Sequence, residues 1–352
     1  MNLDDLIAIS SIDTSGLSSH IRNIPDDAIA AWHAGRDHQQ KETSSISRIF
    51  LCGTGTSLIT LRILEAYLGR NSSIPVSVNT GMFLPQWAYD RQSLVIICSL
   101  TGNEPELKQL MTQCTGKASQ LIVISPAGPI QVLTQTAGFS YIPVNYSGPA
   151  RTAFPQAFFA PLGVLTAMGL IQVHEEEISD LRSELRKTCD QLDLSTPITS
   201  NPAKRLAGQF MNRLVTLFAS GAMVDVANIW KAFLNENAKA WAQVEEIGIA
   251  SRVTVGGMCS PEAQLSQMMT IFLETPFDEP VSLAASGKLR ELFMVEGFNT
   301  DYYIPSGNSP LKTLWNAIVF GIYVSYYLSI AYGIDPLPNP GIEEMDYFLS
   351  EL

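Results

Sequence analysis

The sequence contains little charge and no cluster of basic residues. Only 16% of its 352 residues are Asp, Glu, Lys or Arg, 46% are apolar, and the formal net charge is −12. An apolar fraction this large excludes an intrinsically disordered chain, which lacks the side chains to build a core. Nucleic acid is not expected as a partner, because contacts to a phosphate backbone need a basic face.

Cysteines are few, and none has the spacing of a metal site. The five are Cys52, Cys98, Cys114, Cys189 and Cys259. Because the N-terminus lacks a secretory hydrophobic segment, we expect reduced thiols and a cytoplasmic protein. Cys52 and Cys98 stand inside apolar runs and are interpreted as core residues.

One uncharged run, residues 313–334, is long enough to span a bilayer. The run also contains four tyrosines, two serines and an asparagine. A helix buried between domains or subunits explains this composition more simply than a membrane span. We therefore expect no membrane association.

What the sequence does contain is a strand, a glycine-bearing turn and a helix that occur twice. The first copy runs from Arg48 to Leu68 and the second from Arg213 to Lys239. In each, the unpaired N–H groups and the positive dipole end of the helix face the turn, where they favour an anion. The length predicts two domains. The expected fold class is α/β, with two related halves that each form a parallel β-sheet flanked by helices.

The order of elements supports this division, because strands and helices alternate in both halves. The predicted strands are Ile49–Cys52, Val76–Val78, Leu94–Cys98, Leu121–Ile124, Tyr141–Val144, Leu214–Phe218, Met268–Leu273 and Tyr302–Ile304. The predicted helices are Leu58–Leu68, Pro105–Gln113, Phe154–Ile171, His174–Asp193, Val224–Lys239, Val281–Glu296 and Pro310–Tyr332. The predicted parts are a helical segment packing on the first domain (1–45), a first domain (46–175), a linking helix and boundary (176–204), and a second domain with the C-terminal helix (205–352).

Three loops that follow strands of the first half carry suitable chemistry for a binding site. They are Gly53–Ser57, Ser99–Asn103 and Gly148–Arg151. Ligands of parallel sheets bind beyond the carboxyl ends of the strands, and hydroxyls, backbone N–H groups and a guanidinium suit a phosphate or oxyanion. Each loop alone also fits tight packing, a helix N-cap or a surface arginine. Their combination favours a site.

Glu236 is a candidate general base in the second half. It lies at the edge of an apolar helix face that includes Trp230 and Phe233. Partial desolvation there would raise its pKa toward the range useful for a base. A surface glutamate that pairs with Lys239, three residues later, is the alternative.

Together these segments resemble the bacterial and archaeal bifunctional phosphoglucose/phosphomannose isomerase family, which is built from two sugar-isomerase (SIS) domains. The resemblance runs from about residue 20 almost to the C-terminus. The motifs that carry it are a glycine-serine loop (Cys52–Ser57), LPxW (Leu84–Trp87), a serine-rich phosphate loop (Ser99–Asn103), an arginine segment (Gly148–Ala153), the FNENAK helix (Phe233–Lys239), and a C-terminal helix with its exit (Tyr323–Leu328, Gly333–Pro336). The FNENAK segment is the most specific.

The resemblance implies roles for individual residues. Glu236 would move the proton between C1 and C2, and Arg151 would stabilise the enediolate. Lys312 lies about one residue from the place of a late catalytic lysine or arginine, and it also fits an ordinary surface lysine. The substrate and its phosphate would be bound by Gly55, Ser57, Ser99 and Thr101. No metal or cofactor is implied, and the partners would be a sugar phosphate and a second copy of the chain.

Two departures from the family pattern leave two functions open. Glu104 stands where the family has a phosphate-binding threonine, and we expect it either to cap the helix that begins at Pro105 or to repel a phosphate. The second half has no histidine to open the sugar ring. The first function is an aldose–ketose isomerase of hexose 6-phosphates that acts through an enediol. The second is a SIS protein that binds a sugar phosphate or another carbohydrate derivative with little or no turnover.

Overall fold

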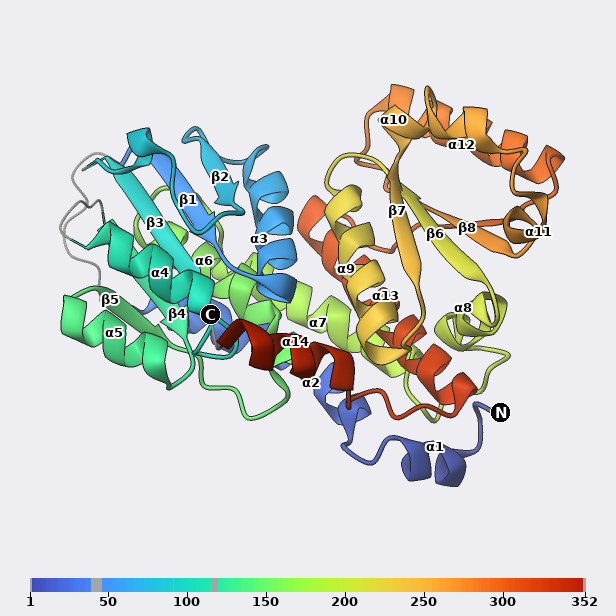
Figure 1. The fold of residues 1–352 in the computed structure, drawn as a ribbon, viewed down its shortest axis with the longest axis horizontal. Coiled ribbons are helices and arrows are strands. Elements are labelled where there is room, and N and C mark those ends of the chain that lie inside the picture. The colour runs from blue at the N-terminus through green and yellow to red at the C-terminus, as the bar shows by residue number, and fades with distance from the viewer. Residues whose placement is uncertain (1, 39–45, 91, 116–119, 351–352) are drawn as a thin grey trace. The chain divides into compact units, whose positions relative to one another are not determined.

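The structure is a computed structural model, and it describes residues 2–38, 46–90, 92–115 and 120–350. Two parallel β-sheets, one of five strands and one of four, form the framework of these residues (Figure 1). Helices flank both sheets. The predicted fold class, α/β with two parallel sheets, is confirmed.

The first sheet has the strand order β2-β1-β3-β4-β5, and all its neighbours are parallel. Its strands are β1 (Arg48–Cys52), β2 (Val76–Asn79), β3 (Ser93–Cys98), β4 (Gln120–Ser125) and β5 (Ser140–Pro143). Every residue of β3 is buried, as expected for a central strand covered on both faces. The burial of Cys52 and Cys98 confirms their interpretation as core residues, and burial raises the pKa of both thiols.

Two pairs of helices cover the first sheet. Helix α3 (Gly55–Leu68) packs against α6 (Pro155–Ala167), and α4 (Pro105–Cys114) packs against α5 (Pro129–Ala137). The chain leaves β1 and β3 toward opposite edges of the sheet, so right-handed crossovers place α3 and α4 on opposite faces (Figure 1). A proline in the first turn of α4, α5 and α6 favours the start of each helix.

The second sheet has the order β7-β6-β8-β9 and is also parallel throughout. Its strands are β6 (Leu214–Ala219), β7 (Ala242–Glu246), β8 (Met268–Leu273) and β9 (Asn299–Tyr303). Helix α9 (Met223–Asn237) follows β6, and α12 (Pro280–Val295) follows β8. Strand β7 was not predicted from the sequence.

Helix α13 (Pro310–Tyr332) is the long uncharged helix, and it packs against α8 (Pro202–Phe210) and α9. Among the described residues it has the length and hydropathy of a membrane span, with a mean hydropathy of 1.4, yet 94% of the tested window is buried by protein. Polar residues of the helix have internal partners: Asn316 binds Thr188, and Ser325 binds Asn237. This burial agrees with the interpretation of residues 313–334 as a buried helix.

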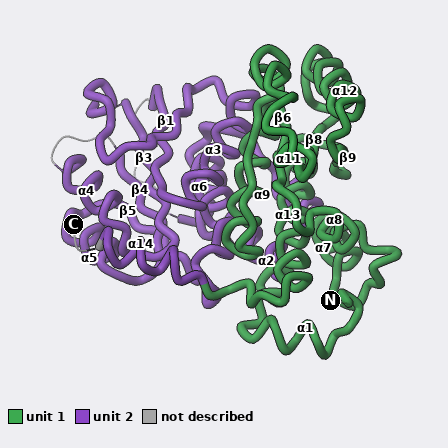
Figure 2. Tube along the Cα trace, turned by 45° about the vertical axis from the view of Figure 1, so that its right-hand side comes forward, with its two compact units in different colours: residues 1–22, 183–338 green, residues 23–182, 339–352 purple. Residues whose placement is uncertain are grey.

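The chain divides into two compact units (Figure 2). One comprises residues 1–22 and 183–338 with the second sheet, and the other comprises 23–182 and 339–352 with the first sheet. The division differs from the predicted one at both chain ends. Residues before Asn23 group with the second sheet, and α14 (Pro340–Ser350) groups with the first. Part of the predicted N-terminal segment, residues 39–45, lies outside the described residues.

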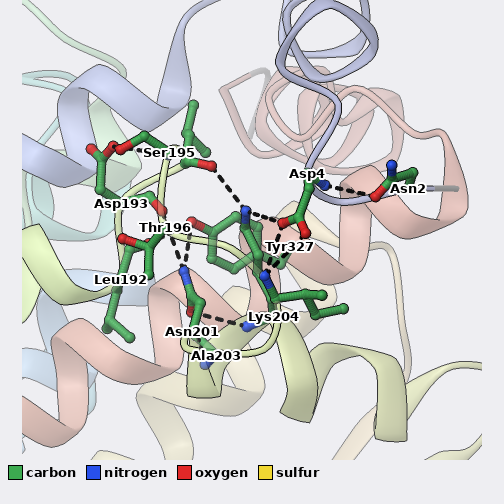
Figure 3. Close-up of polar contacts among 12 residues, drawn as sticks. Asn2, Asp4, Leu192, Asp193, Ser195, Thr196, Asn201, Ala203, Lys204 and Tyr327 are labelled. Carbon is green, nitrogen blue, oxygen red and sulfur yellow. Dashed lines mark hydrogen bonds and ion pairs between the residues drawn. The ribbon is translucent and has the colours of Figure 1, made fainter.

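A buried lysine explains why the first residues group with the second sheet (Figure 3). The side chain of Lys204 on α8 is fully buried, and its ammonium donates to Asp4 Oδ1 (3.0 Å) and to the carbonyl of Leu194 (2.9 Å). Tyr326 on α13 donates to Asp13 Oδ2 at 3.0 Å. A buried ammonium needs such partners, so these contacts hold residues 2–22 to this unit.

The remaining elements include two long helices, α2 and α7, and several short helices and turns. They are α1 (Leu6–Ile12), α2 (Leu17–Arg36), the 3₁₀ turns Gln86–Ala88, Ala150–Ala153 and Thr254–Gly257, α7 (Glu175–Gln191), α10 (Ile247–Ala250) and α11 (Glu262–Leu265).

Candidate active site

The strand order of the first sheet marks a point where a ligand would bind. Because β1 and β3 are neighbours whose crossovers run in opposite directions, they form the topological switch point of the sheet, and ligands of such sheets bind beyond the carboxyl ends of the strands at this point. The β1–α3 loop, taken here as residues 53–54 with the first three residues of α3 (55–57), and the β3–α4 loop (residues 99–104) flank this point. The structure therefore brings together Gly55, Ser57, Ser99, Thr101 and Glu104 on two adjacent loops.

In the β1–α3 loop, Ser57 stabilises the turn. Its hydroxyl accepts from the N–H of Thr54 (3.0 Å) and donates to the carbonyl of Thr54 (2.8 Å), and its side chain is buried. A Cβ at Gly53 would lie 2.6 Å from Ser57 Oγ, so only glycine fits there. Gly55 has φ +50°, a conformation that favours glycine, and begins α3. Ser57 thus supports the backbone at the start of α3.

In the β3–α4 loop, Ser99 and Gly102 define the turn. Ser99 is fully buried, and its hydroxyl accepts from the N–H of Gly102 at 2.7 Å. Gly102 has φ +79° and packs so closely on the loop after β4 that a Cβ would lie 3.2 Å from the carbonyl oxygen of Ala127. This turn directs several loop N–H groups to one side, which is the arrangement of an anion-binding nest.

The Glu104 carboxylate occupies the donors of this loop. Its Oε1 accepts from the N–H groups of Leu100 and Thr101, both at 3.1 Å. Its Oε2 accepts from the N–H of Asn103 (3.2 Å) and from the hydroxyl of Ser99 (2.5 Å). Although Glu104 is the N-cap residue of α4, its side chain makes no capping bond to that helix. The expectation of a helix cap is therefore wrong, because the carboxylate turns back to four donors in the loop before it.

Arg151 belongs to the same unit as these two loops. It belongs to the 3₁₀ turn Ala150–Ala153, which follows β5 after an irregular segment, and it is half-buried. The neighbouring Thr152 donates to the carbonyl of Pro149 (2.7 Å) and contacts the hydroxyl of Tyr146 (2.6 Å). Burial raises the pKa of Tyr146 to about 12, so this phenol is neutral near pH 7. These contacts stabilise the turn that carries Arg151.

Glu236 and Lys312 belong to the unit of the second sheet. Glu236 is half-buried in the last turn of α9, and Lys312 is half-buried in the first turn of α13. The backbone N–H of Lys312 points to the Oγ of Ser309, the N-cap residue of α13, at 3.4 Å. Helices α9 and α13 pack directly on each other, so both candidates lie on one pair of helices.

The other polar residues of the FNENAK segment fix the end of α9. Asn235 accepts from the N–H of Ala242 (3.2 Å), and Asn237 donates to Ser325 on α13 (3.0 Å). Lys239 has φ +52°, and its ammonium donates to the carbonyls of Glu236 (2.9 Å), Asn237, Asp335 and Pro336. The motif thus holds the helix end that carries the Glu236 carboxylate. These supporting roles were not predicted from the sequence, although a positively charged residue just after a helix end is a recognised signal for them.

Comparisons with known proteins agree with these features. Residues 199–346 match the model of the bacterial phospho-glucose isomerase C-terminal SIS domain. A bifunctional phosphoglucose/phosphomannose isomerase from Caldicellulosiruptor bescii is 26% identical over 336 residues, which cover 94% of this chain and 98% of that relative. One from Aquifex aeolicus is 22% identical over 313 residues, which cover 87% and 91%.

A solved structure shares the fold. A hypothetical protein from Thermus thermophilus matches with a TM-score of 0.72 at 14% identity, over 98% of this chain and 93% of that chain. The predicted resemblance is thus confirmed: residues 199–346 match the model of the bacterial phospho-glucose isomerase C-terminal SIS domain, and over nearly its whole length the chain is similar to the bifunctional phosphoglucose/phosphomannose isomerases.

Proposed function

We propose that the protein is a cytoplasmic aldose–ketose isomerase that interconverts glucose 6-phosphate and fructose 6-phosphate, with mannose 6-phosphate as a further substrate. The observation that carries this proposal is the similarity to two relatives named for these activities, which extends over 94% and 87% of the chain. The two loops at the switch point of the first sheet support it, because they offer backbone N–H groups at helix starts to a phosphate.

In the proposed reaction, the carboxylate of Glu236 removes the proton from C2 of the open-chain aldose and returns it to C1. The electron pair of the C2–H bond forms the C1–C2 double bond of the enediolate, and a proton moves from O2 to O1, so the aldose becomes the ketose with no net oxidation or reduction. The guanidinium of Arg151 would bind the enediolate oxygens, where a planar cation with several donors is effective. A proton transfer by a positioned carboxylate contributes a factor of about 10² to 10⁴ in rate.

A second function remains in view, a protein that binds a sugar phosphate without turning it over. Two observations favour it. The carboxylate of Glu104 occupies donors of the proposed phosphate loop, and residues 205–352 contain no histidine. Without a histidine to open the sugar ring, the enzyme would depend on water for ring opening or on substrate that is already in the open-chain form.

Turnover separates the two functions. Purified protein is incubated with fructose 6-phosphate, and formation of glucose 6-phosphate is followed, beside a calorimetric titration with the same sugar. Isomerisation supports the first function. Binding without turnover supports the second. The same two assays are repeated with glucose 6-phosphate and mannose 6-phosphate, and the absence of both binding and turnover with all three sugars contradicts both functions.

The Glu236→Gln variant tests the assigned base. It keeps the shape and hydrogen-bonding capacity of the side chain, so kcat should fall by about 10² or more while affinity stays within a few-fold. Glu291→Gln is the matched control, because it makes the same change on the surface of the same unit, where Glu291 pairs with Lys288. An active Glu236→Gln variant would show that another group moves the proton.

We also propose that the protein is a homodimer, as its resemblance to the isomerase family implies. Sedimentation at micromolar concentration measures the mass, and a clean monomer of 38.5 kDa contradicts the dimer.

A further inference from the structure

The β3–α4 loop (residues 99–104) contains an unusual pairing of an anion-binding backbone with a carboxylate of the chain itself. Each oxygen of Glu104 accepts two hydrogen bonds, and the donors are three loop N–H groups and the buried hydroxyl of Ser99. The same loop is attached to the first turn of α5, since the carbonyl of Gly102 accepts from the N–H of Ile130 at 3.0 Å. The donors are therefore fixed in place and already satisfied.

We propose that Glu104 is a specificity-determining residue: its carboxylate is an internal ligand of the β3–α4 loop, and a substrate phosphate reaches the loop only by displacing it. This inference rests on the proposed function, because it takes the loop as the phosphate site. Phosphate oxygens need the donors that Oε1 and Oε2 already use, and one set of N–H groups cannot serve two anions. Phosphate affinity is then set by the residue at position 104.

Occupation of the loop donors by the Glu104 carboxylate is a different effect from repulsion of the phosphate by its charge. A second glutamate separates the two effects. Glu106 lies in the first turn of the same helix α4, so it adds the same negative charge near the same helix terminus. Glu104, however, is the residue that accepts the hydrogen bonds of the loop donors. Removing either charge relieves repulsion, whereas only the removal of Glu104 opens the loop.

The experiment measures binding of inorganic phosphate to the full-length chain, labelled with ¹⁵N, by following amide signals. Wild type is compared with Glu104→Ala, Glu104→Thr, Glu104→Gln and the control Glu106→Ala. In the absence of phosphate, Glu104→Ala should shift the amide signals of Leu100, Thr101 and Asn103, because their acceptor is gone. The control should leave these three signals in place.

On addition of phosphate, Glu104→Ala and Glu104→Thr should bind at least tenfold more tightly than wild type, with the change reported by the three loop amides. Glu106→Ala should stay within about twofold of wild type. Glu104→Gln should gain less than Glu104→Ala, since its amide oxygen can still accept two of the loop bonds. If Glu104→Ala is unfolded, as its circular dichroism would show, Glu104→Thr decides by the same criteria.

Three results would overturn the proposal: no gain in affinity on loss of Glu104, an equal gain in Glu106→Ala, or phosphate binding that leaves the loop amides unmoved. The test does not involve catalysis. A protein without isomerase activity can pass it, and an active isomerase can fail it, so its outcome is distinct from that of the proposed function.

Discussion

Replacing a helix glycine by alanine usually stabilises a protein, but the close approach of α9 and α13 predicts that Gly321→Ala destabilises this one. A Cβ at Gly321 would lie only 2.2 Å from Nε1 of the buried Trp230 and 2.4 Å from its Cδ1. The same indole N–H donates to the carbonyl of Ala317 at 2.8 Å. Because backbone and indole are both fixed, Gly321→Ala must move one helix away from the other.

The free energy of unfolding that Gly321→Ala should lose follows from three contributions. Overpacking of a core costs about 1–3 kcal/mol, and loss of a buried hydrogen bond costs about 1–3 kcal/mol more. The higher helix propensity of alanine offsets about 1 kcal/mol of this. The net loss is centred on about 3 kcal/mol, which lowers the Tm of a unit of this size by about 6–12 °C.

Scanning calorimetry measures this change, and Gly208→Ala is the matched control. Gly208 lies in α8 of the same unit, and a Cβ there would meet no atom within 4 Å. The control should therefore gain about 0.5–1 kcal/mol in stability. Adding Trp230→Leu to Gly321→Ala should recover part of the loss, because the two changes share one contact. A Gly321→Ala variant as stable as the control would show that α9 and α13 accommodate the added methyl group without loss.

Two further predictions concern the unit that contains the first sheet. Arg151→Lys should lower kcat by about tenfold or more at unchanged fold stability, because lysine lacks the planar fork of donors; equal rates in a coupled assay would make Arg151 a surface residue. Burial, with a smaller contribution from Asp26, raises the pKa of Asp27 to about 6, and its Oδ2 has no hydrogen-bond partner among the described residues. The folded pKa exceeds the unfolded one, so the destabilisation is full above about pH 6 and disappears below about pH 4. Asp27→Asn should thus raise Tm at pH 8 and not at pH 4, and a pH-independent difference would contradict this.

The central strands and the long helix could be predicted because their signals are local. Strand β8 and helix α13 have the predicted bounds, and β3 differs by one residue, since strands and helices buried on all sides appear as continuous apolar runs. Strand β7 (Ala242–Glu246) was missed. It lies at the edge of its sheet and is only partly buried, so it contains two glutamates and shows no apolar run.

The partners of distant segments could not be predicted. Nothing in residues 1–22 indicates that Asp4 binds Lys204 or that Asp13 binds Tyr326, because both contacts join residues about 200 or more positions apart. The direction of the Glu104 side chain was also undetermined. The side chain of a glutamate before a proline at a helix start can cap the helix, or it can turn back and accept hydrogen bonds from the preceding loop. Which of these occurs depends here on Gly102, whose positive φ aligns the loop donors.

The two halves share the order of their strands and differ in the composition of one pair of loops. Gly55 and Gly221 have nearly the same backbone conformation, with φ +50° and +54°, and each precedes or begins the helix after the first strand of its sheet. The loops after β3 and β8 differ in composition, because residues 274–279 of the second loop include three acids and no basic residue. There Asp278 accepts from the N–H of Thr275 at 3.0 Å, so this loop also holds its own carboxylate. A phosphate would therefore meet negative charge at either loop. Only in the first loop does a single side chain, Glu104, take up the convergent donors, which is why one substitution there should be enough to open a phosphate site.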